Sequence, residues 1–209
     1  MKVINPSVIL EQEINPVLVM KHIEKAGRVC YKSENMISDG TDEKFIKKIL
    51  ERGHESVIEH VSLTFRIICD RGVTHELVRH RIASYSQEST RYCNYSKDKF
   101  GNELTFIRPC FWDDDCVQYK LWEQAMRQVE ESYFALIKEG ALPQEARSVL
   151  PNSLKTEILV TMNLREWRHF LKLRTSKAAH PQMRQVAVMI YDILSEKLPI
   201  IFKDIEIDN

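Results

Sequence analysis

Residues 79–92 form the segment whose side chains are best suited to chemistry. Four of them are basic and only Glu88 is acidic, in a chain whose formal net charge is zero. The basic residues are Arg79, His80, Arg81 and Arg91, and the hydroxyl-bearing residues are Ser84, Ser86, Ser89 and Thr90. Guanidinium groups pair with phosphate oxygens, and hydroxyls fill the remaining lone pairs. The segment therefore indicates a site for a phosphorylated ligand. Basic residues at a helix end can also serve only to complement the helix dipole.

Standard sequence motifs for nucleotides and metals do not account for this site. The chain lacks both GxGxxG and GxxxxGK[ST], so arginine side chains would have to hold any phosphates. His54 and His60 stand beside carboxylates, but their spacing is not that of HExxH. We therefore expect no metal site.

The hydrophobic pattern predicts the elements that position these residues. Strands are expected at 2–10, 61–69, 104–108 and 156–161, and helices at 16–30, 41–52, 73–81, 114–138, 143–150, 163–172 and from 181 to Pro199. Thr41 is expected to cap the second helix, and 70–72 is expected to be a turn. Residues 82–102 show no clean period and are predicted to be a long loop. Strands and helices without regular alternation indicate an α+β fold.

Composition limits the class of protein. With 209 residues, 44% of them hydrophobic, 30 basic and 30 acidic, the chain is expected to fold as one soluble domain, residues 1–209. Its neutrality predicts neither a nucleic-acid nor a membrane partner. Five scattered cysteines without a CxxC pair suit a reducing cytoplasm rather than a disulfide framework.

The spacing within residues 79–92 also resembles a family signature. Arg79-His80-Arg81, seven further residues, and then Ser89 with Arg91 and Tyr92 are similar to the signature of the flavin-dependent thymidylate synthases. The resemblance covers most of the chain, through Gly53-His54-Glu55-Ser56, Glu59-His60, Arg147 before Val149-Leu150-Pro151, Asn163 with Arg165, and Leu171-Lys172-Leu173-Arg174. It implies a single α+β domain with a mainly antiparallel sheet flanked by helices.

The family's reaction follows from the same resemblance. Such enzymes transfer the methylene group of 5,10-methylenetetrahydrofolate to carbon 5 of dUMP, using FAD and NADPH, and release dTMP and tetrahydrofolate. Two phosphate-bearing nucleotides must then lie side by side, which the arginines of this chain would complement. A single small domain offers little concave surface for three ligands, so a homotetramer with active sites between subunits is expected.

On the dUMP side, the resemblance implies one catalytic residue, Arg174, whose guanidinium favours the enolate-like form of the uracil ring. The substrate-binding residues it implies are Glu76, Arg79, Gln87, Ser89, Arg91, Arg147 and Arg174. Ser89 is expected to contact dUMP rather than attack it, because hydride delivery from the flavin removes the need for an enzyme–substrate adduct. Taken alone, Arg174 is more typical of a helix-end arginine that binds backbone carbonyls.

On the flavin side, the resemblance implies His54, Ser56, Glu59, Arg79, His80, Arg81, Ile82, Asn163, Arg165 and His169. Asn163 also suits a helix N-cap, with Glu166 three positions later as in a capping box. The two roles are compatible, because an exposed helix N-terminus attracts the anionic groups of a cofactor.

Two positions depart from the family pattern. Glu76 stands where the family commonly has Gln, and Gln87 stands where it commonly has Glu. An acid and an amide thus appear exchanged across the dUMP-facing region, with the total charge unchanged. We hypothesise that the two positions are coupled.

Two other functions remain open from the sequence. A nucleic-acid or nucleotide-binding module without catalysis would use the same basic patch, although only Tyr85 and Tyr92 supply rings there. The thymidylate synthases that use a cysteine nucleophile offer another mechanism, with Cys110 as the candidate residue.

Overall fold

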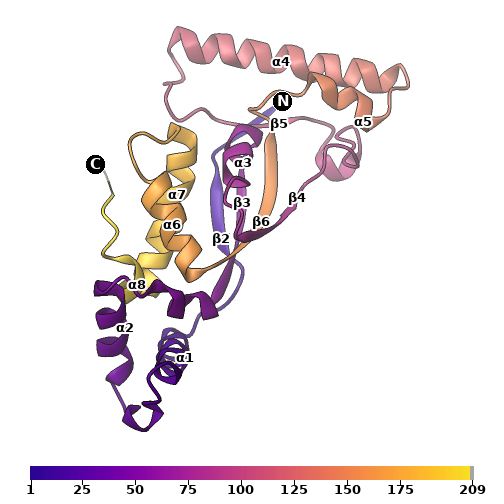
Figure 1. Ribbon diagram of the computed structural model, residues 1–209. Coiled ribbons are helices and arrows are strands. Elements are labelled where there is room, and N and C mark those ends of the chain that lie inside the picture. The colour runs from indigo at the N-terminus through magenta and orange to yellow at the C-terminus, as the bar shows by residue number, and fades with distance from the viewer. Residues whose placement is uncertain (208–209) are drawn as a thin grey trace. The chain divides into compact units, whose positions relative to one another are not determined.

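The computed structural model describes residues 1–207, apart from the side chain of residue 99, and the chain packs as two compact units (Figure 1). The first unit comprises residues 1–7, 67–79 and 85–159. The second comprises residues 8–66, 80–84 and the chain from Val160 onward. Each is described below by itself, and a single domain over the whole chain stays a prediction.

The strands confirm the α+β class. A four-stranded sheet has the order β2 (Ser7–Leu10), β3 (Ser62–Asp70), β6 (Lys155–Asn163) and β4 (Ala83–Gln87). A separate pair joins β1 (Lys2–Ile4) to β5 (Thr105–Ile107) in parallel, with Lys2 opposite Thr105. The alternation predicted for β3 is confirmed, since Leu63, Phe65, Ile67 and Cys69 are buried.

In the first unit, the longest helix covers an aromatic core. The unit contains α3 (Arg71–Leu77), a 3₁₀ turn at Asp98–Phe100, α4 (Val117–Lys138), α5 (Pro143–Ala146) and a 3₁₀ turn at Arg147–Val149. Helix α4 packs on α5, as Figure 1 shows. Its core consists of Tyr95, Leu104, Phe106, Met126, Tyr133, Ala146 and Leu154.

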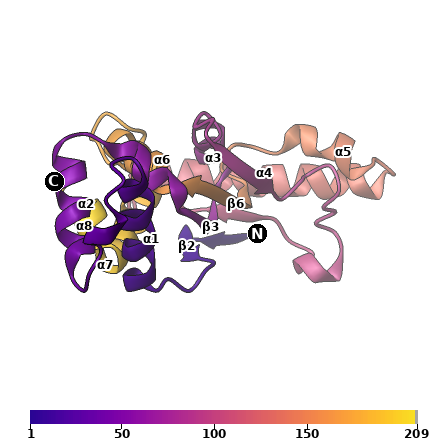
Figure 2. The same ribbon diagram turned by 60° about the horizontal axis from the view of Figure 1, so that its bottom comes forward.

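The second unit is built mainly from helices. It contains α1 (Pro16–Val29), α2 (Thr41–Glu51), α6 (Leu164–Arg174), α7 (Pro181–Lys197) and α8 (Pro199–Phe202), with 3₁₀ turns at Glu34–Met36 and Glu55–His60. Helix α1 packs on α2, and α6 and α8 both pack on α7 (Figure 2). The Trp167 ring meets the Phe65 ring edge-on at 5.0 Å, and its indole nitrogen donates to the carbonyl of Leu63 at 3.1 Å. Helix α6 is thereby fixed to β3. Among the described helices, none is both long and apolar enough to cross a membrane.

Several predicted boundaries were wrong, each for a local reason. Gly40, with φ of +78°, is the N-cap of α2 instead of Thr41, whose hydroxyl donates to Glu24. Asp70 does not begin a turn; its carboxylate caps α3 by accepting from the Val73 N–H at 2.7 Å. Helix α3 consequently begins and ends earlier than predicted, and Arg79 lies beyond it.

The long loop predicted at 82–102 was also wrong in part, because it contains β4. This strand lies at the edge of its sheet, and its residues alternate between half-buried and exposed. Serines at 84 and 86 occupy the exposed face. A strand of this kind has no hydrophobic period, so the pattern alone did not reveal it.

Stability of the second unit depends on one buried arginine, Arg168. It is 2% exposed and forms two hydrogen bonds of 2.6 Å with the Asp204 carboxylate. Asp204→Asn is expected to lower the free energy of unfolding by about 1–3 kcal/mol at neutral pH. Losing a partner of a buried charge costs about 3–5 kcal/mol, and Asp204 itself is half exposed, which reduces the effect. Urea unfolding measures it, with Asp192→Asn as the matched surface control.

The same prediction has a definite pH dependence. Hydrogen bonds from Arg168 lower the pKa of the Asp204 carboxyl below its ordinary 3.8. The contribution of Asp204 to the free energy of unfolding is therefore fully present above pH 3.8, and it is lost as the pH falls through the lower, folded-state pKa. Equal stability of Asp204→Asn and the wild type at neutral pH would contradict this account.

Candidate active site

A cavity of about 430 Å³ lies beside the N-terminal part of α6 and is called the α6 cavity here. It is lined by Glu55, Glu59, Ile82, Asn163, Arg165, Glu166, His169 and Lys172. Five of these residues are flavin-side residues implied by the family resemblance: Glu59, Ile82, Asn163, Arg165 and His169. They come from three separate parts of the sequence. The fold thus brings half of the implied flavin set together around one cavity.

The end of β6 and the start of α6 position the polar groups of this cavity. Asn163 is the predicted N-cap of α6, and its side-chain oxygen accepts from the backbone N–H of Glu166 at 2.9 Å. This confirms the capping half of the expected motif. The reciprocal half is absent among the described contacts, because the Glu166 carboxylate instead contacts His80.

Two cations of the cavity are held by weak surface ion pairs. Arg165 lies 2.5 Å from Glu59, and Lys172 lies 3.5 Å from Glu55, with about half of each cationic side chain exposed. Exposed pairs of this kind contribute only about 0–1 kcal/mol. An incoming anion can therefore compete for both cations at little cost.

A buried hydrogen-bond chain joins three residues of the second unit. The Nδ1 atom of His80 lies 3.0 Å from Oε1 of Glu166, and Nε of Arg174 donates to Nε2 of His80 at 3.2 Å. His80 is 5% exposed and Glu166 is 8% exposed. Rings of Phe170 and His169 pack edge-on against the imidazole at 5.1 and 5.7 Å. The chain fixes one side of the Arg174 guanidinium.

This geometry determines the protonation of His80. An arginine Nε always carries a hydrogen, so the facing Nε2 of His80 must accept, and the single proton of a neutral imidazole lies on Nδ1, toward Glu166. Burial, together with the positive charge of Arg174, lowers the pKa of His80 below 6.5 and outweighs the opposing effect of Glu166. Arg174 thus faces a neutral acceptor at neutral pH.

His80, Glu166 and His169 also place three potential metal ligands within 4.8 Å of one another. Both ring nitrogens of His80 are already engaged, and a guanidinium stands 3.2 Å from one of them. A metal ion would have to displace that cation and bear its repulsion. The cluster is better explained as the hydrogen-bond chain.

The remaining flavin-side residues do not line the α6 cavity. Ser56 is exposed and does not line it, and His54 lines a second cavity on the α1–α2 side of the same unit. Arg79 and Arg81 are exposed on either side of the buried His80. Since both nitrogens of His80 bond within the chain, its ring acts on neighbours inside the protein.

The implied dUMP-side residues of the first unit fall into two groups. Gln87, on β4, donates through its amide nitrogen to the hydroxyls of Thr74 at 3.1 Å and Thr156 at 3.2 Å. Next to it, Glu88 bonds Tyr95 and Lys155, both at 2.8 Å. Gln87 is therefore held by hydroxyls rather than by a cation, which suits an amide better than a carboxylate.

The second group lies near α5. Arg91 donates to Gln144 at 3.3 Å, and Arg147 follows α5 directly and is exposed. The Ser89 hydroxyl accepts from the backbone of Arg91 at 3.3 Å. Arg91 thus contacts α5, and Arg147 directly follows this helix, so two arginines from distant positions lie at the same short helix.

Cys110, the alternative nucleophile, lies in a poor environment for that role. Partial burial raises the pKa of its thiol. A nucleophilic cysteine needs a lowered pKa, which a neighbouring cation or helix N-terminus normally provides. The structure thus disfavours the cysteine mechanism. All five cysteines are free.

Sequence reasoning missed three residues of the α6 cavity: Glu55, Glu166 and Lys172. Glu55 and Lys172 appeared only as neighbours within quoted motifs, and Glu166 only as a capping-box partner. One signal was available. Glu166, His169 and Lys172 recur every three residues from Asn163, so they lie along one side of the same helix.

Comparisons with known proteins show which family the chain matches. A family model described as "Thymidylate synthase complementing protein" matches residues 19–200. A flavin-dependent thymidylate synthase of Pyrococcus furiosus is 40% identical over 172 residues, covering 82% of this chain and 70% of the relative. One from Geobacter sulfurreducens is 38% identical over 186 residues, covering 86% and 78%.

A solved structure shows the same fold. It is a UMP/dUMP methylase, PolB, from Streptomyces cacaoi, bound with 5-Br dUMP. The TM-score is 0.80 with 23% sequence identity, and the match covers 97% of this chain and 96% of the other. The likeness extends to nearly the whole of both chains.

Proposed function

Because the chain belongs to the flavin-dependent thymidylate synthases, we propose that it methylates dUMP to dTMP, with FAD as cofactor. The proposed carbon donor is 5,10-methylenetetrahydrofolate, the proposed reductant is NADPH, and tetrahydrofolate is released. The observation that carries the proposal is the α6 cavity, where residues implied by the resemblance from three parts of the chain meet.

The α6 cavity suits part of a flavin nucleotide. Arg165 and Lys172 can exchange weak carboxylate partners for phosphate oxygens, and the nearby N-terminus of an eleven-residue helix favours negative charge. Ile82, which is 67% exposed, offers an apolar surface for a ring. Glu59, Asn163 and His169 supply further polar contacts. These residues would hold FAD, which supplies the reducing equivalents when bound.

Arg174 is proposed to act on the pyrimidine of dUMP. A guanidinium cannot lose its proton at working pH, so it can only stabilise negative charge. Placed at the edge of the uracil ring, it favours the enolate-like form, which makes carbon 5 nucleophilic. The hydrogen bonds through His80 and Glu166 fix the Nε side of the Arg174 guanidinium. They thereby define the direction in which its terminal nitrogens point.

Residues of the first unit that the resemblance assigns to dUMP are also proposed to bind it. Arg91 and Arg147 suit its phosphate, and Ser89 adds a hydroxyl. Glu76 and Gln87 complete the implied set. The neutral partners of Gln87 explain why an amide is tolerated at a position where a carboxylate is common in the family.

Assembly and location are further parts of the proposal. The α6 cavity, at about 430 Å³, lies toward the lower end of the roughly 300–1,000 Å³ typical of small-molecule sites. It holds a portion of a dinucleotide rather than the whole. A homotetramer with active sites between subunits would supply the remaining surface. Five free thiols suit a reducing cytoplasm.

The proposed function is tested by spectroscopy and a coupled assay. The purified protein should show flavin absorption bands, or acquire them on adding FAD. It should oxidise NADPH faster in the presence of dUMP and release tritium from carbon 5 of labelled dUMP when methylenetetrahydrofolate is present. A correctly assembled protein that stays colourless with excess FAD would overturn the proposal.

A further inference from the structure

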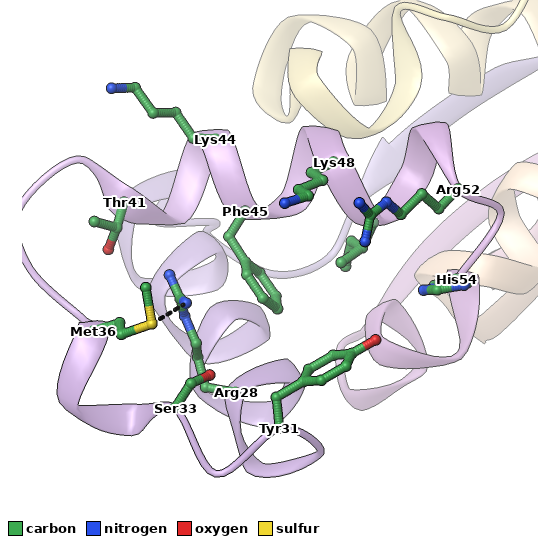
Figure 3. A pocket seen from close by; sticks show the side chains of 11 residues that line it. Arg28, Tyr31, Ser33, Met36, Thr41, Lys44, Phe45, Lys48, Arg52 and His54 are labelled. Carbon is green, nitrogen blue, oxygen red and sulfur yellow. Dashed lines mark hydrogen bonds between the residues drawn. The ribbon is translucent and has the colours of Figure 1, made fainter.

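The second cavity of about 420 Å³ lies between α1 and α2 and is called the α1–α2 pocket here (Figure 3). Its apolar wall consists of Tyr31, Met36, Phe45 and Ile49, and His54 lies at one end. Gly27 makes room for this wall, because a Cβ atom there would lie 2.5 Å from the Phe45 ring. Tyr31 is 63% exposed. An exposed ring beside a pocket offers a stacking surface for another ring.

Among the described residues that line the α1–α2 pocket, none is acidic and four are Lys or Arg. Arg28 is already neutralised, since Glu24 accepts from it at 2.8 and 3.1 Å. The other three are Lys44, Lys48 and Arg52, and in the described part of the chain their side chains form no ion pair or hydrogen bond. The pocket therefore presents three uncompensated positive charges, which select for an anionic ligand.

These three cations are regularly spaced. Each follows the last by four residues along α2 and its C-cap, Arg52, so successive charges are about 6 Å apart along the helix axis. In Figure 3, Lys48 and Arg52 extend over the pocket, and Lys44 stands at the outer end, away from His54. The row covers roughly 12 Å in total. A single phosphate or carboxylate could contact only one end of it.

Folate tails have a matching repeat. They consist of γ-linked glutamates, each with one free α-carboxylate, and the last glutamate also keeps its γ-carboxylate. An α-linked residue spans about 3.5 Å when extended, and the two additional methylene bonds of a γ-linkage lengthen this repeat to roughly 6 Å. We propose that the α1–α2 pocket binds the oligoglutamyl tail of the folate donor, with successive carboxylates on Arg52, Lys48 and Lys44. This inference rests on the proposed function.

The pocket also sets the direction of the tail. His54 belongs to the implied flavin-side set and lies at the Arg52 end, near Tyr31. The aromatic part of the folate would therefore lie at this end, and the tail would run outward along α2. The KM for the folate should depend on the length of the glutamyl tail up to about three carboxylates, because the row of cations ends at Lys44.

The test compares methylenetetrahydrofolate carrying one, three and five glutamates. In the wild type, KM should fall by roughly tenfold from one glutamate to three, since exposed ion pairs contribute about two- to fivefold each, and then remain level. The gain should shrink as salt is added. In Lys44→Gln/Lys48→Gln, which removes the partners of the second and third carboxylates, the ratio of KM between one and three glutamates should approach one.

The matched control is Lys47→Gln, because Lys47 lies on the same helix but lines another cavity. It should keep the wild-type ratio. Turnover of the monoglutamate with no effect of chain length would overturn this inference and leave the proposed function intact. No turnover of any folate would instead contradict the proposed function. A rise in KM for NADPH in the double variant, with an unchanged folate ratio, would assign the pocket to the phosphates of the reductant.

Discussion

Replacing Arg174 by alanine is expected to lower kcat/KM for tritium release from dUMP by about 10³-fold. Loss of one group that stabilises a developing oxyanion costs about 10²–10³ in rate, and the lost group here is fully charged. Arg174→Lys should recover only part of the rate. The lysine ammonium keeps the positive charge, but it lacks the Nε–H that donates to His80, and it cannot form the two parallel hydrogen bonds of a guanidinium. The measurement is tritium release under saturating flavin.

Two controls separate this effect from damage to the fold. Flavin absorption and the urea midpoint should be unchanged in Arg174→Ala, since the residue is only half buried at the end of α6. Arg127→Ala removes an exposed arginine whose recorded partner is Glu123 on its own helix, and it should keep full activity. Activity of Arg174→Ala within tenfold of the wild type would exclude it as the residue that activates the uracil ring.

Local patterns predicted most of the elements, and the resemblance named five of the eight residues that line the α6 cavity. Asn163, Arg165 and His169 line the same cavity because they lie within two turns of one helix, so helix geometry alone keeps them near each other. Ile82 and Glu59 reach the same cavity only through long-range packing. Their inclusion came from the family pattern, which already carries that three-dimensional information.

Other features have no signature in local sequence. The capping-box pattern correctly predicted Asn163 as the N-cap of α6. It wrongly predicted the partner of Glu166, whose carboxylate bonds a histidine 86 positions earlier. Similarly, Asp204 lies 36 positions from Arg168. Such contacts depend on which elements pack together. The sequence alone does not specify that packing, so it predicts only which side chains are available for the contacts.

The hydrogen-bond chain leads to the second large effect. Glu166→Gln should lower kcat about 10- to 100-fold while flavin binding is retained, because small misplacements of a catalytic group are costly. The carboxylate only accepts, so it keeps the His80 proton on Nδ1. A glutamine can turn its NH₂ toward Nδ1, which moves the proton to Nε2 and sets two donors, His80 and Arg174, against each other. Glu196→Gln, an exposed acid on α7, is the matched control.

The pH profile distinguishes positioning from a merely structural role. Burial, Arg174 and His169 lower the pKa of His80, while Glu166 raises it. Activity should therefore be level above pH 6.5 and decline only as the pH falls toward the lowered pKa, where an imidazolium would confront Arg174. Glu166→Gln removes the raising influence, so its acidic limb should move to lower pH even as its plateau rate falls.

His80→Gln tests the same chain from its centre. Its amide oxygen can still accept from Arg174, but it has no proton to gain, so the acidic limb assigned to His80 should disappear while part of the rate survives. His80→Ala should lose the rate without that rescue. If Glu166→Gln and His80→Gln both leave the acidic limb where it is in the wild type, the limb belongs to another group. Arg174 would then be held in place without this chain.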